Sequence, residues 1–322
     1  MDIGKKIIQI QNRITHYLPR AMIGYVTAPI DLVKSSILFL KYFFFSLFLI
    51  FCIARAASTA ATIDVYAVNY PLTYFAERIG GNYVNVMFPA PPDIDPAFWS
   101  PDPETIRKYQ QADLIILNGA GYAKWTKKAS LPMLRSVNTA QAFADNLIQI
   151  QTETTHSHGP TGEHSHAGTA FTTWLDFSQA AQQAEAIYLA LAKKLPDYQK
   201  KLKENFQELE TDLLNLDLQL LDLSALKPGI PLYGSHPIYQ YLVRRYGVNM
   251  KMVMWEPDED PGDQHWRELD LIQTEHPSSW MIWEDEPLQA SIDRLAEMGI
   301  RSLVFSPCFN RPEKEDFLAV MK

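Results

Sequence analysis

The segment 177–222 carries apolar side chains at the spacing of one helical face almost from end to end, and Pro196 is its only strong break. Such a stripe predicts either a coiled coil or a long helix packed along a globular body. The proline, and the alternating segments on both sides, favour a long, proline-broken helix that lies across two lobes. The apolar positions are Ala180, Ala184, Ile187, Leu191, Leu202, Phe206, Leu209, Leu213, Leu216 and Leu220.

Short apolar runs alternate with helical runs on both sides of this segment. Many of the runs are uninterrupted and rich in Val, Ile and Leu, which is typical of parallel strands buried on both faces. The alternation predicts an α/β fold of two doubly wound αβ lobes, bridged by the long helix, with a cleft between the lobes. The expected limits are 62–176 for the N-terminal lobe, 177–222 for the linking helix and 228–322 for the C-terminal lobe. We expect strands at 63–68, 83–88, 113–117, 231–233, 250–255, 280–283 and 302–305, and helices at 72–79, 103–111, 238–246, 265–274 and 289–298.

Residues 1–56 are expected to be an N-terminal extension ending in a signal peptide. Segment 42–54 is uncharged and apolar, a length that suits the core of a signal peptide and is short for a membrane span. Ala54-Arg55-Ala56 then supplies the small-x-small pattern of a cleavage site. We therefore expect export, with an uncleaved membrane anchor as the alternative. Cys52 follows Phe51, a poor lipoprotein signal because a small residue is expected before the cysteine.

Charge, cysteines and motifs exclude several classes of function. The formal net charge of −8 at pH 7 argues against nucleic acid as a partner, because phosphate binding calls for a basic face. The two cysteines, Cys52 and Cys308, have no ligand spacing and exclude an all-cysteine zinc site. None of the common hydrolase, metalloprotease, P-loop or dinucleotide-binding motifs is present in the sequence, so we expect no enzymatic activity.

The loop 155–168 contains four of the eight histidines, as two His-x-His pairs. Neutral imidazole is a good ligand for zinc and similar ions, and two pairs on one loop can close around a single ion. The alternative is a polar linker whose histidines only keep it soluble. The candidate ligands of the loop are His156, His158, His164 and His166.

Further candidate ligands lie where strands are expected to end. His236 follows a short strand and begins a helix, so its side chain can point into the cleft. Carboxylates fall at corresponding places, with Asp93 and Asp95 in the first lobe and Glu284 and Glu286 in the second. One imidazole with two or three carboxylates would make a site harder than a pure histidine site, suited to manganese or iron as well as zinc.

The order of these segments resembles the cluster A-I solute-binding proteins of ABC transporters, the periplasmic receptors for zinc and manganese. The resemblance covers the chain from about Thr62 to its end. It rests on Pro91-Pro92-Asp93-Ile94-Asp95-Pro96-Ala97, Ala112-Asp113-Leu114-Ile115 with Asn118-Gly119, Trp174-Leu175-Asp176, Ser235-His236-Pro237, Arg244-Arg245-Tyr246-Gly247 and Glu286-Pro287.

The resemblance implies a metal site of three histidines and one carboxylate, and this chain departs from that set. Only His236 matches a ligand position of the family. The other three positions are Ala97, Thr172 and Ser306, which cannot rebuild a closed tetrahedral zinc site.

By the resemblance, we expect a monomeric periplasmic protein that delivers a divalent metal ion, zinc before manganese or iron, to an ABC permease in the inner membrane. Two alternatives remain open: the same fold binding a metal chelate or small organic ligand, and an envelope interaction protein without a transport role. Because three ligand positions are replaced, the histidine loop is expected to be the strongest metal-binding feature. Deleting 155–166 should then reduce zinc stoichiometry more than His236→Ala does.

Overall fold

The computed structural model describes residues 62–322 except 93, 151–154, 159–161 and 166–167. The chain divides into two compact units, Met1–Ala61 and Thr62–Lys322, of which the second is the one described. The expected signal peptide, its cleavage site and Cys52 therefore lie outside the described residues. Within the part that the structure describes, no helix is both long enough and apolar enough to cross a membrane.

The first sheet contains four parallel strands in the order β2-β1-β3-β4. Its central strands are buried because their side chains are apolar on both faces, as Val65, Ile115 and Ile116 show with 0% exposure. The observed elements match the predicted positions, although the strands are shorter than predicted and β4 was not predicted. The elements are β1 (Ile63–Ala67), α3 (Tyr70–Gly80), β2 (Val84–Met87), α4 (Pro103–Gln111), β3 (Leu114–Leu117) and β4 (Ser136–Asn138).

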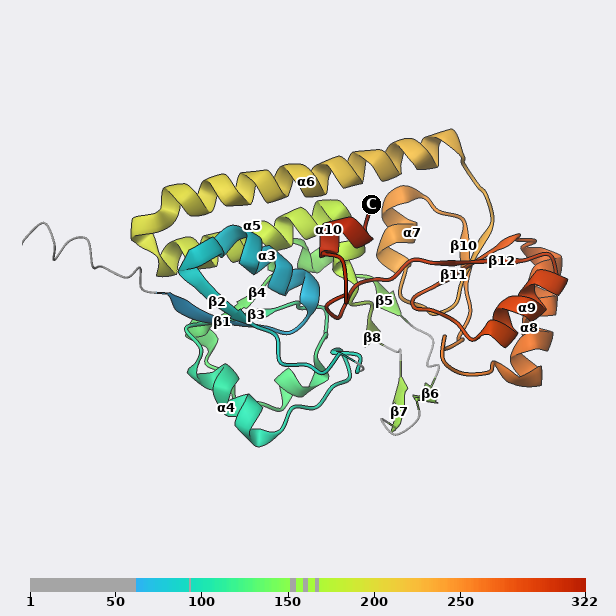
Figure 1. The fold of residues 1–322 in the computed structure, drawn as a ribbon, viewed down its shortest axis with the longest axis horizontal. Coiled ribbons are helices and arrows are strands. Elements are labelled where there is room, and N and C mark those ends of the chain that lie inside the picture. Colours follow the sequence, from blue (N-terminus) through green and yellow to red (C-terminus); the bar gives the residue numbers. More distant parts are fainter. Residues whose placement is uncertain (1–61, 93, 151–154, 159–161, 166–167) are drawn as a thin grey trace, which may run out of the picture. The chain divides into compact units, whose positions relative to one another are not determined.

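The second sheet repeats this topology, with four parallel strands in the order β10-β9-β11-β12. In both sheets the first strand of the lobe lies between the second and the third, so two doubly wound halves are present as predicted (Figure 1). Three tryptophans of this lobe, Trp255, Trp266 and Trp283, are buried in one cluster of their own. The elements are β9 (Leu232–Gly234), α7 (Gln240–Tyr246), β10 (Met250–Met252), α8 (Gly262–Glu275), β11 (Trp280–Trp283), α9 (Gln289–Glu297) and β12 (Arg301–Val304).

The long helical segment forms two helices, α5 (Phe177–Lys194) and α6 (Gln199–Leu226). Pro196 begins a short 3₁₀ turn between them, and the chain reverses there, so that α5 and α6 pack side by side (Figure 1). The apolar stripe is thus shared by a helical hairpin, in which Leu191, Leu202 and Leu209 are fully buried. The single long span is α6, whose 28 residues correspond to about 42 Å at 1.5 Å per residue.

An ion pair between a half-exposed arginine and a buried aspartate fastens α6 to α7. The guanidinium of Arg245 donates to both carboxylate oxygens of Asp217, over 2.9 and 2.6 Å, and the Tyr246 hydroxyl donates to the same carboxylate over 3.0 Å. Tyr246 in turn accepts a hydrogen bond from the backbone N–H of Phe177 at the start of α5. The Arg-Arg-Tyr-Gly sequence therefore joins both helices of the hairpin to the second lobe.

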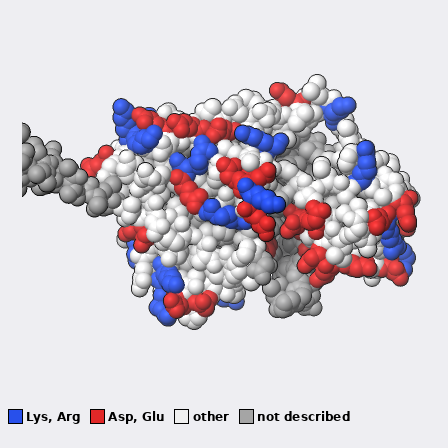
Figure 2. All heavy atoms as spheres, in the orientation of Figure 1, with Lys and Arg blue, Asp and Glu red and all other residues white. Residues whose placement is uncertain are grey.

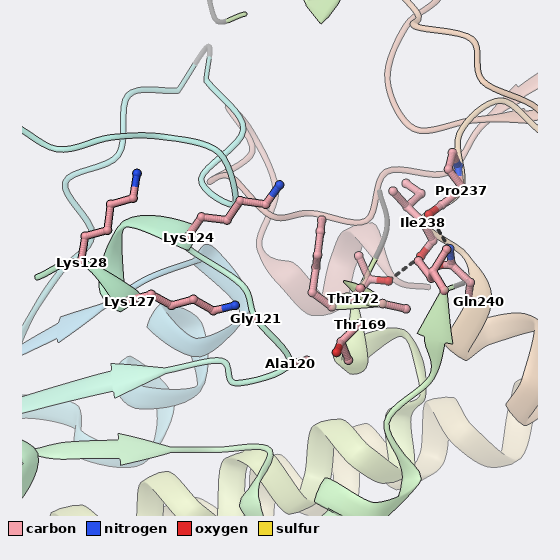
Figure 3. A pocket seen from close by; sticks show the side chains of 14 residues that line it. Ala120, Gly121, Lys124, Lys127, Lys128, Thr169, Thr172, Pro237, Ile238 and Gln240 are labelled. Atoms are coloured by element: carbon pink, nitrogen blue, oxygen red, sulfur yellow. Dashed lines mark hydrogen bonds between the residues drawn. The ribbon is translucent and has the colours of Figure 1, made fainter. Parts of the chain in front are cut away.

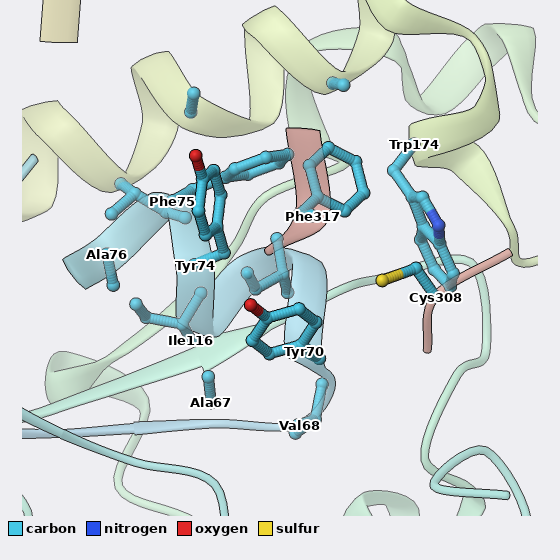
Figure 4. Close-up of a cluster of buried hydrophobic side chains, with 14 of the residues drawn as sticks. Ala67, Val68, Tyr70, Tyr74, Phe75, Ala76, Ile116, Trp174, Cys308 and Phe317 are labelled. Carbon is cyan, nitrogen blue, oxygen red and sulfur yellow. The ribbon is translucent and has the colours of Figure 1, made fainter. Parts of the chain in front are cut away.

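The end of the chain crosses back to the first lobe. The backbone N–H of Tyr70 donates to the carbonyl of Phe309 over 2.9 Å, and the indole of Trp174 donates to the carbonyl of Pro307 over 2.7 Å. The last helix, α10 (Phe317–Val320), then packs Phe317 edge-on against Phe75 of α3, with ring centroids 5.3 Å apart (Figure 4). Two covalent connections therefore run between the lobes, because the hairpin leads into the second lobe and the C-terminal segment returns from it.

Acidic and basic side chains are interspersed over the face of the molecule shown in Figure 2. No continuous basic surface is visible on the described part of that face, in keeping with the negative net charge. Two small antiparallel pairs lie after the first sheet, β5 (Gln149–Ile150) with β8 (Gly168–Thr169) and β6 (Thr155–His158) with β7 (Gly162–Ser165).

Candidate metal centre

His236 lies directly beyond the carboxyl end of β9, the strand between β10 and β11. Backbone hydrogen bonds hold the turn on both sides, since the N–H of Ser235 donates to the carbonyl of Ile282 and its carbonyl accepts from the N–H of Trp255. The imidazole is only 3% exposed. A histidine with so little exposure needs polar partners, because burying an unsatisfied ring nitrogen destabilises the fold.

Two glutamates supply those partners. Nδ1 of His236 lies 3.0 Å from Oε1 of Glu256 and 3.4 Å from Oε1 of Glu284. Glu284 follows β11 directly and Glu256 lies in the loop after β10, so the two strands that flank β9 each contribute one carboxylate. One ligand atom from each of the three side chains lies within 4.8 Å of the others. The geometry arises because carboxyl ends of adjacent parallel strands meet at one edge of a sheet.

The pKa values of Glu284 and His236 are both raised in this cluster, so both groups hold their protons more tightly than usual. Burial raises the pKa of Glu284 to about 7, against the attraction of His236. Burial alone would lower the pKa of His236, but Glu284 and Glu256 outweigh it and hold the pKa above its ordinary value. A proton shared between these groups neutralises part of their charge, and a divalent cation would do so more completely.

Asp95 is the contribution of the first lobe. Its Oδ1 accepts a hydrogen bond of 2.8 Å from the backbone N–H of Ala97, and its pKa is raised to about 6, chiefly by burial, with His236 and Lys124 opposing the rise. Asn310, from the returning C-terminal segment, donates to the carbonyl of Ile94 over 2.8 Å and so holds the loop that carries Asp95. Asp95 is close enough to the cluster to feel its charge, but it is not one of the three convergent ligands.

The three residues that the sequence resemblance matches to family ligand positions, which remains a prediction, make other contacts in the structure. Ala97 is buried at 1% exposure in the first lobe. Thr172, fully buried, donates its hydroxyl proton to the carbonyl of Ile238. Ser306 accepts a hydrogen bond of 3.2 Å from the backbone N–H of Cys308. Ala97 therefore packs in the core, Thr172 joins the two lobes by a hydrogen bond, and Ser306 stabilises a turn.

Within the described residues, the other predicted ligands do not lie in this cluster. Glu286 is exposed, two residues beyond Glu284, and Asp93 lies outside the described residues. In the histidine loop, the backbone pairing of β6 with β7 sets His156 opposite His164 in register. His158 lies opposite Gly162, and His166 is outside the described residues.

Glu256 was not predicted as a ligand, although the sequence contained a signal for it. It is the first residue of an acidic loop that follows the strand predicted at 250–255. The loop holds four carboxylates, and only knowledge of the strand order shows that its first member borders β9. Its neighbours Asp258, Glu259 and Asp260 are all exposed, as expected for solvated loop charges.

Two buried hydroxyls near these groups have no hydrogen-bond partner among the described residues. They belong to Ser235, which precedes His236, and to Tyr122, whose pKa is raised by burial and by the nearby negative charge of Asp95. A buried hydroxyl without a partner is unfavourable by itself. Such atoms are suited to a site that receives a further polar group, whether an ion with its water or a ligand oxygen.

With one imidazole and two carboxylates converging, the site has the chemistry of a divalent-metal centre. A comparison with known families supports this reading, because the model of zinc-uptake complex component A, periplasmic (ZnuA), matches residues 65–322. The chain belongs to this family. The resemblance recognised in the sequence and the fold class predicted from it are confirmed.

The relatives of this ZnuA-family chain carry names that refer to more than one metal. It is 24% identical over 257 residues to the high-affinity zinc uptake system protein ZnuA of Bacillus subtilis, covering 78% of this chain and 80% of that protein. It is 24% identical over 302 residues to the manganese ABC transporter substrate-binding lipoprotein PsaA of Streptococcus pneumoniae, covering 88% and 94%. The crystal structure of the Zn(II)-bound ZnuA-like domain of Streptococcus pneumoniae AdcA shares the fold, with a TM-score of 0.69, 18% identity and coverage of 81% and 95%.

Proposed function

We propose that this chain is an extracytoplasmic substrate-binding protein that captures a divalent metal ion and delivers it to the membrane permease of an ABC importer. The observation that carries the proposal is the convergence of His236, Glu256 and Glu284 within 4.8 Å at the carboxyl edge of the second sheet. Membership of the zinc-uptake component A family supports it.

Zinc is the first ion to consider, with manganese and iron next. The relative in Bacillus subtilis is named for zinc and the one in Streptococcus pneumoniae for manganese. The ligand set of this chain has more oxygen than nitrogen, which favours harder ions than a site of three histidines does. Asp95 can supply a further oxygen if the first lobe moves toward the second.

The remaining parts of the assignment follow from this role. We propose that residues 1–56 direct export to the periplasm, that 62–176 and 228–322 are the two lobes, that 177–222 links them, and that the protein acts as a monomer. Relatives named as lipoproteins are consistent with an extracytoplasmic location.

Calorimetry on protein purified without an affinity tag tests the proposal. Titration with Zn, Mn and Fe(II) should give one tight event that His236→Ala and Glu284→Gln remove, whereas Glu286→Gln, an exposed carboxylate two residues away, should retain it. Deleting 155–166 should lower the number of zinc ions bound per chain but leave the tight event. Absence of binding by all three ions, or a tight event that survives both cluster variants, would overturn the proposal.

A further inference from the structure

A cavity of about 390 Å³ lies beside the candidate metal centre and differs from it in charge. Lys124, Lys127 and Lys128 line one side of it. None of its described lining residues is an aspartate or a glutamate, although the chain as a whole has a net charge of −8. The negative net charge of the protein repels anions in general. The positive charge of these lysines would attract an anion to this cavity in particular.

The opposite wall begins one residue beyond His236. Pro237 and Ile238 line the cavity, with Gln240, Thr169 and Thr172 providing polar groups. Figure 3 shows Lys124, Lys127 and Lys128 on one side and Thr172, Pro237, Ile238 and Gln240 on the other. The cavity is thus continuous with the turn that carries the histidine of the metal centre.

Lys124 connects the two regions. It is attracted electrostatically to Asp95, and its Nζ lies 4.4 Å from the centre of the Phe98 ring, which follows Asp95 in the chain by three residues. Burial lowers the pKa of Lys124 against the attraction of Asp95. A negatively charged ligand next to Lys124, which is exposed, would add a second attraction to that of Asp95.

The loop that presents the lysines is held in an unusual backbone conformation. Ala120 and Ala123 have φ values of 52° and 51°, in the left-handed region that residues other than glycine rarely adopt. Gly121, at φ 75°, lies between them, and a Cβ added there would lie 3.9 Å from Nζ of Lys127. Backbone strain of this kind is found mainly at functional sites. Here it positions the 3₁₀ helix η3 (Lys124–Lys127), which carries two of the lysines.

We propose that this cavity binds a small polycarboxylate anion that enters together with the metal ion, as a metal chelate. The lysines hold its carboxylates, the polar groups of Thr169, Thr172 and Gln240 accept or donate hydrogen bonds, and His236, Glu256 and Glu284 face the metal. The volume is in the range of small-molecule sites and suits a ligand of the size of citrate. The inference rests on the proposed metal-binding function and adds the class of cargo to it.

Equilibrium dialysis with radiolabelled citrate, with and without zinc, tests the inference on the full chain. The pocket variant carries Lys124→Gln, Lys127→Gln and Lys128→Gln. Its matched control carries Lys194→Gln, Lys200→Gln and Lys203→Gln, which remove the same charge from exposed positions of α5 and α6. Tricarballylate, which lacks the hydroxyl of citrate and chelates metals weakly, serves as the metal-independent probe.

We expect zinc and citrate to be retained together by the unaltered protein and by the control. The pocket variant should bind citrate and tricarballylate at least about tenfold more weakly, while its affinity for zinc alone stays unchanged. Equal retention of citrate by the pocket variant and the control, or failure of the unaltered protein to retain either anion, would overturn the inference. Failure to bind zinc alone, with tricarballylate still bound through the lysines, would instead overturn the metal function and leave the anion site standing.

Discussion

Replacing Glu284 by glutamine should make the metal-free protein more stable while it removes metal binding. The carboxylate is 11% exposed, and its pKa rises from 4.5 to about 7 in the folded protein. At about 1.36 kcal/mol for each pKa unit, ionised Glu284 destabilises the folded state by roughly 3 kcal/mol. Glutamine keeps the shape of the side chain without the charge, so the destabilisation disappears.

The gain should depend on pH with a definite sign. A carboxyl whose folded pKa is raised binds its proton more tightly in the folded state, so stability falls as pH rises from about 4.5 to 7. Glutamine does not titrate. The variant should therefore exceed the unaltered protein by roughly 3 kcal/mol at pH 8, and by less than about 1 kcal/mol at pH 5.

Urea denaturation followed by circular dichroism, in the presence of a chelator, measures both values. Glu286→Gln is the control, because an exposed carboxylate should change stability by no more than about 0.5 kcal/mol. The reasoning is refuted if Glu284→Gln is equal to or less stable than the unaltered protein at pH 8. That result would mean that the carboxylate already has favourable partners, and that the site is a structural ion pair.

Two further perturbations test the site and the frame that holds it. Metal affinity should fall as pH is lowered from 8 to 6, because a proton with a pKa of about 7 on Glu284 must leave before the metal binds. Calorimetry should show that the affinity falls about tenfold per pH unit for each proton displaced. An affinity that stays constant over this range would contradict the prediction. Asp217→Asn should destabilise the protein by about 2 kcal/mol in urea denaturation, since it leaves Arg245 without its buried bidentate partner. The control Asp212→Asn, at a half-exposed pair with Arg78, should have an effect below about 1 kcal/mol. Equal effects of the two variants would refute the special role of Asp217.

The strands and helices of the fold were predictable because their local patterns agree with their tertiary positions. Helix α4 begins at Pro103 behind the capping side chain of Asp102, and it was predicted to the residue. The reversal at Pro196 was not predicted. A proline in a helical pattern indicates a break, but whether the two halves continue in one direction or fold back depends on the surfaces available to their apolar faces, which are set by tertiary packing.

The site was predictable in part, and the limit was strand order. His236 and Glu284 follow strands that are easily recognised, and the rule that ligands bind beyond carboxyl ends selected both. Glu256 and Glu286 each lie in acidic loops after strands, so sequence alone cannot rank them. Pairing of β9 with β10 and β11 places Glu256 against His236, whereas Glu286 lies two residues too far along its loop to be buried.

The distribution of ligands between the lobes bears on how an ion would be held and released. His236, Glu256 and Glu284 all come from the second lobe, and the first lobe contributes Asp95 and the lysine-bearing loop. Ala97 and Thr172 of the first lobe, an alanine and a threonine that donates to the carbonyl of Ile238, are not among the convergent ligand atoms. An ion at this centre can therefore bind without the lobes closing, and closure would add only one carboxylate to it. A chelate whose anionic part contacts the lysines would make contacts with both lobes, so that its binding would favour closure where the bare ion alone would favour it weakly. On the proposed function, the lysine-bearing loop would then give an ion that is held by one lobe a means of drawing the two lobes together through its own anionic ligand.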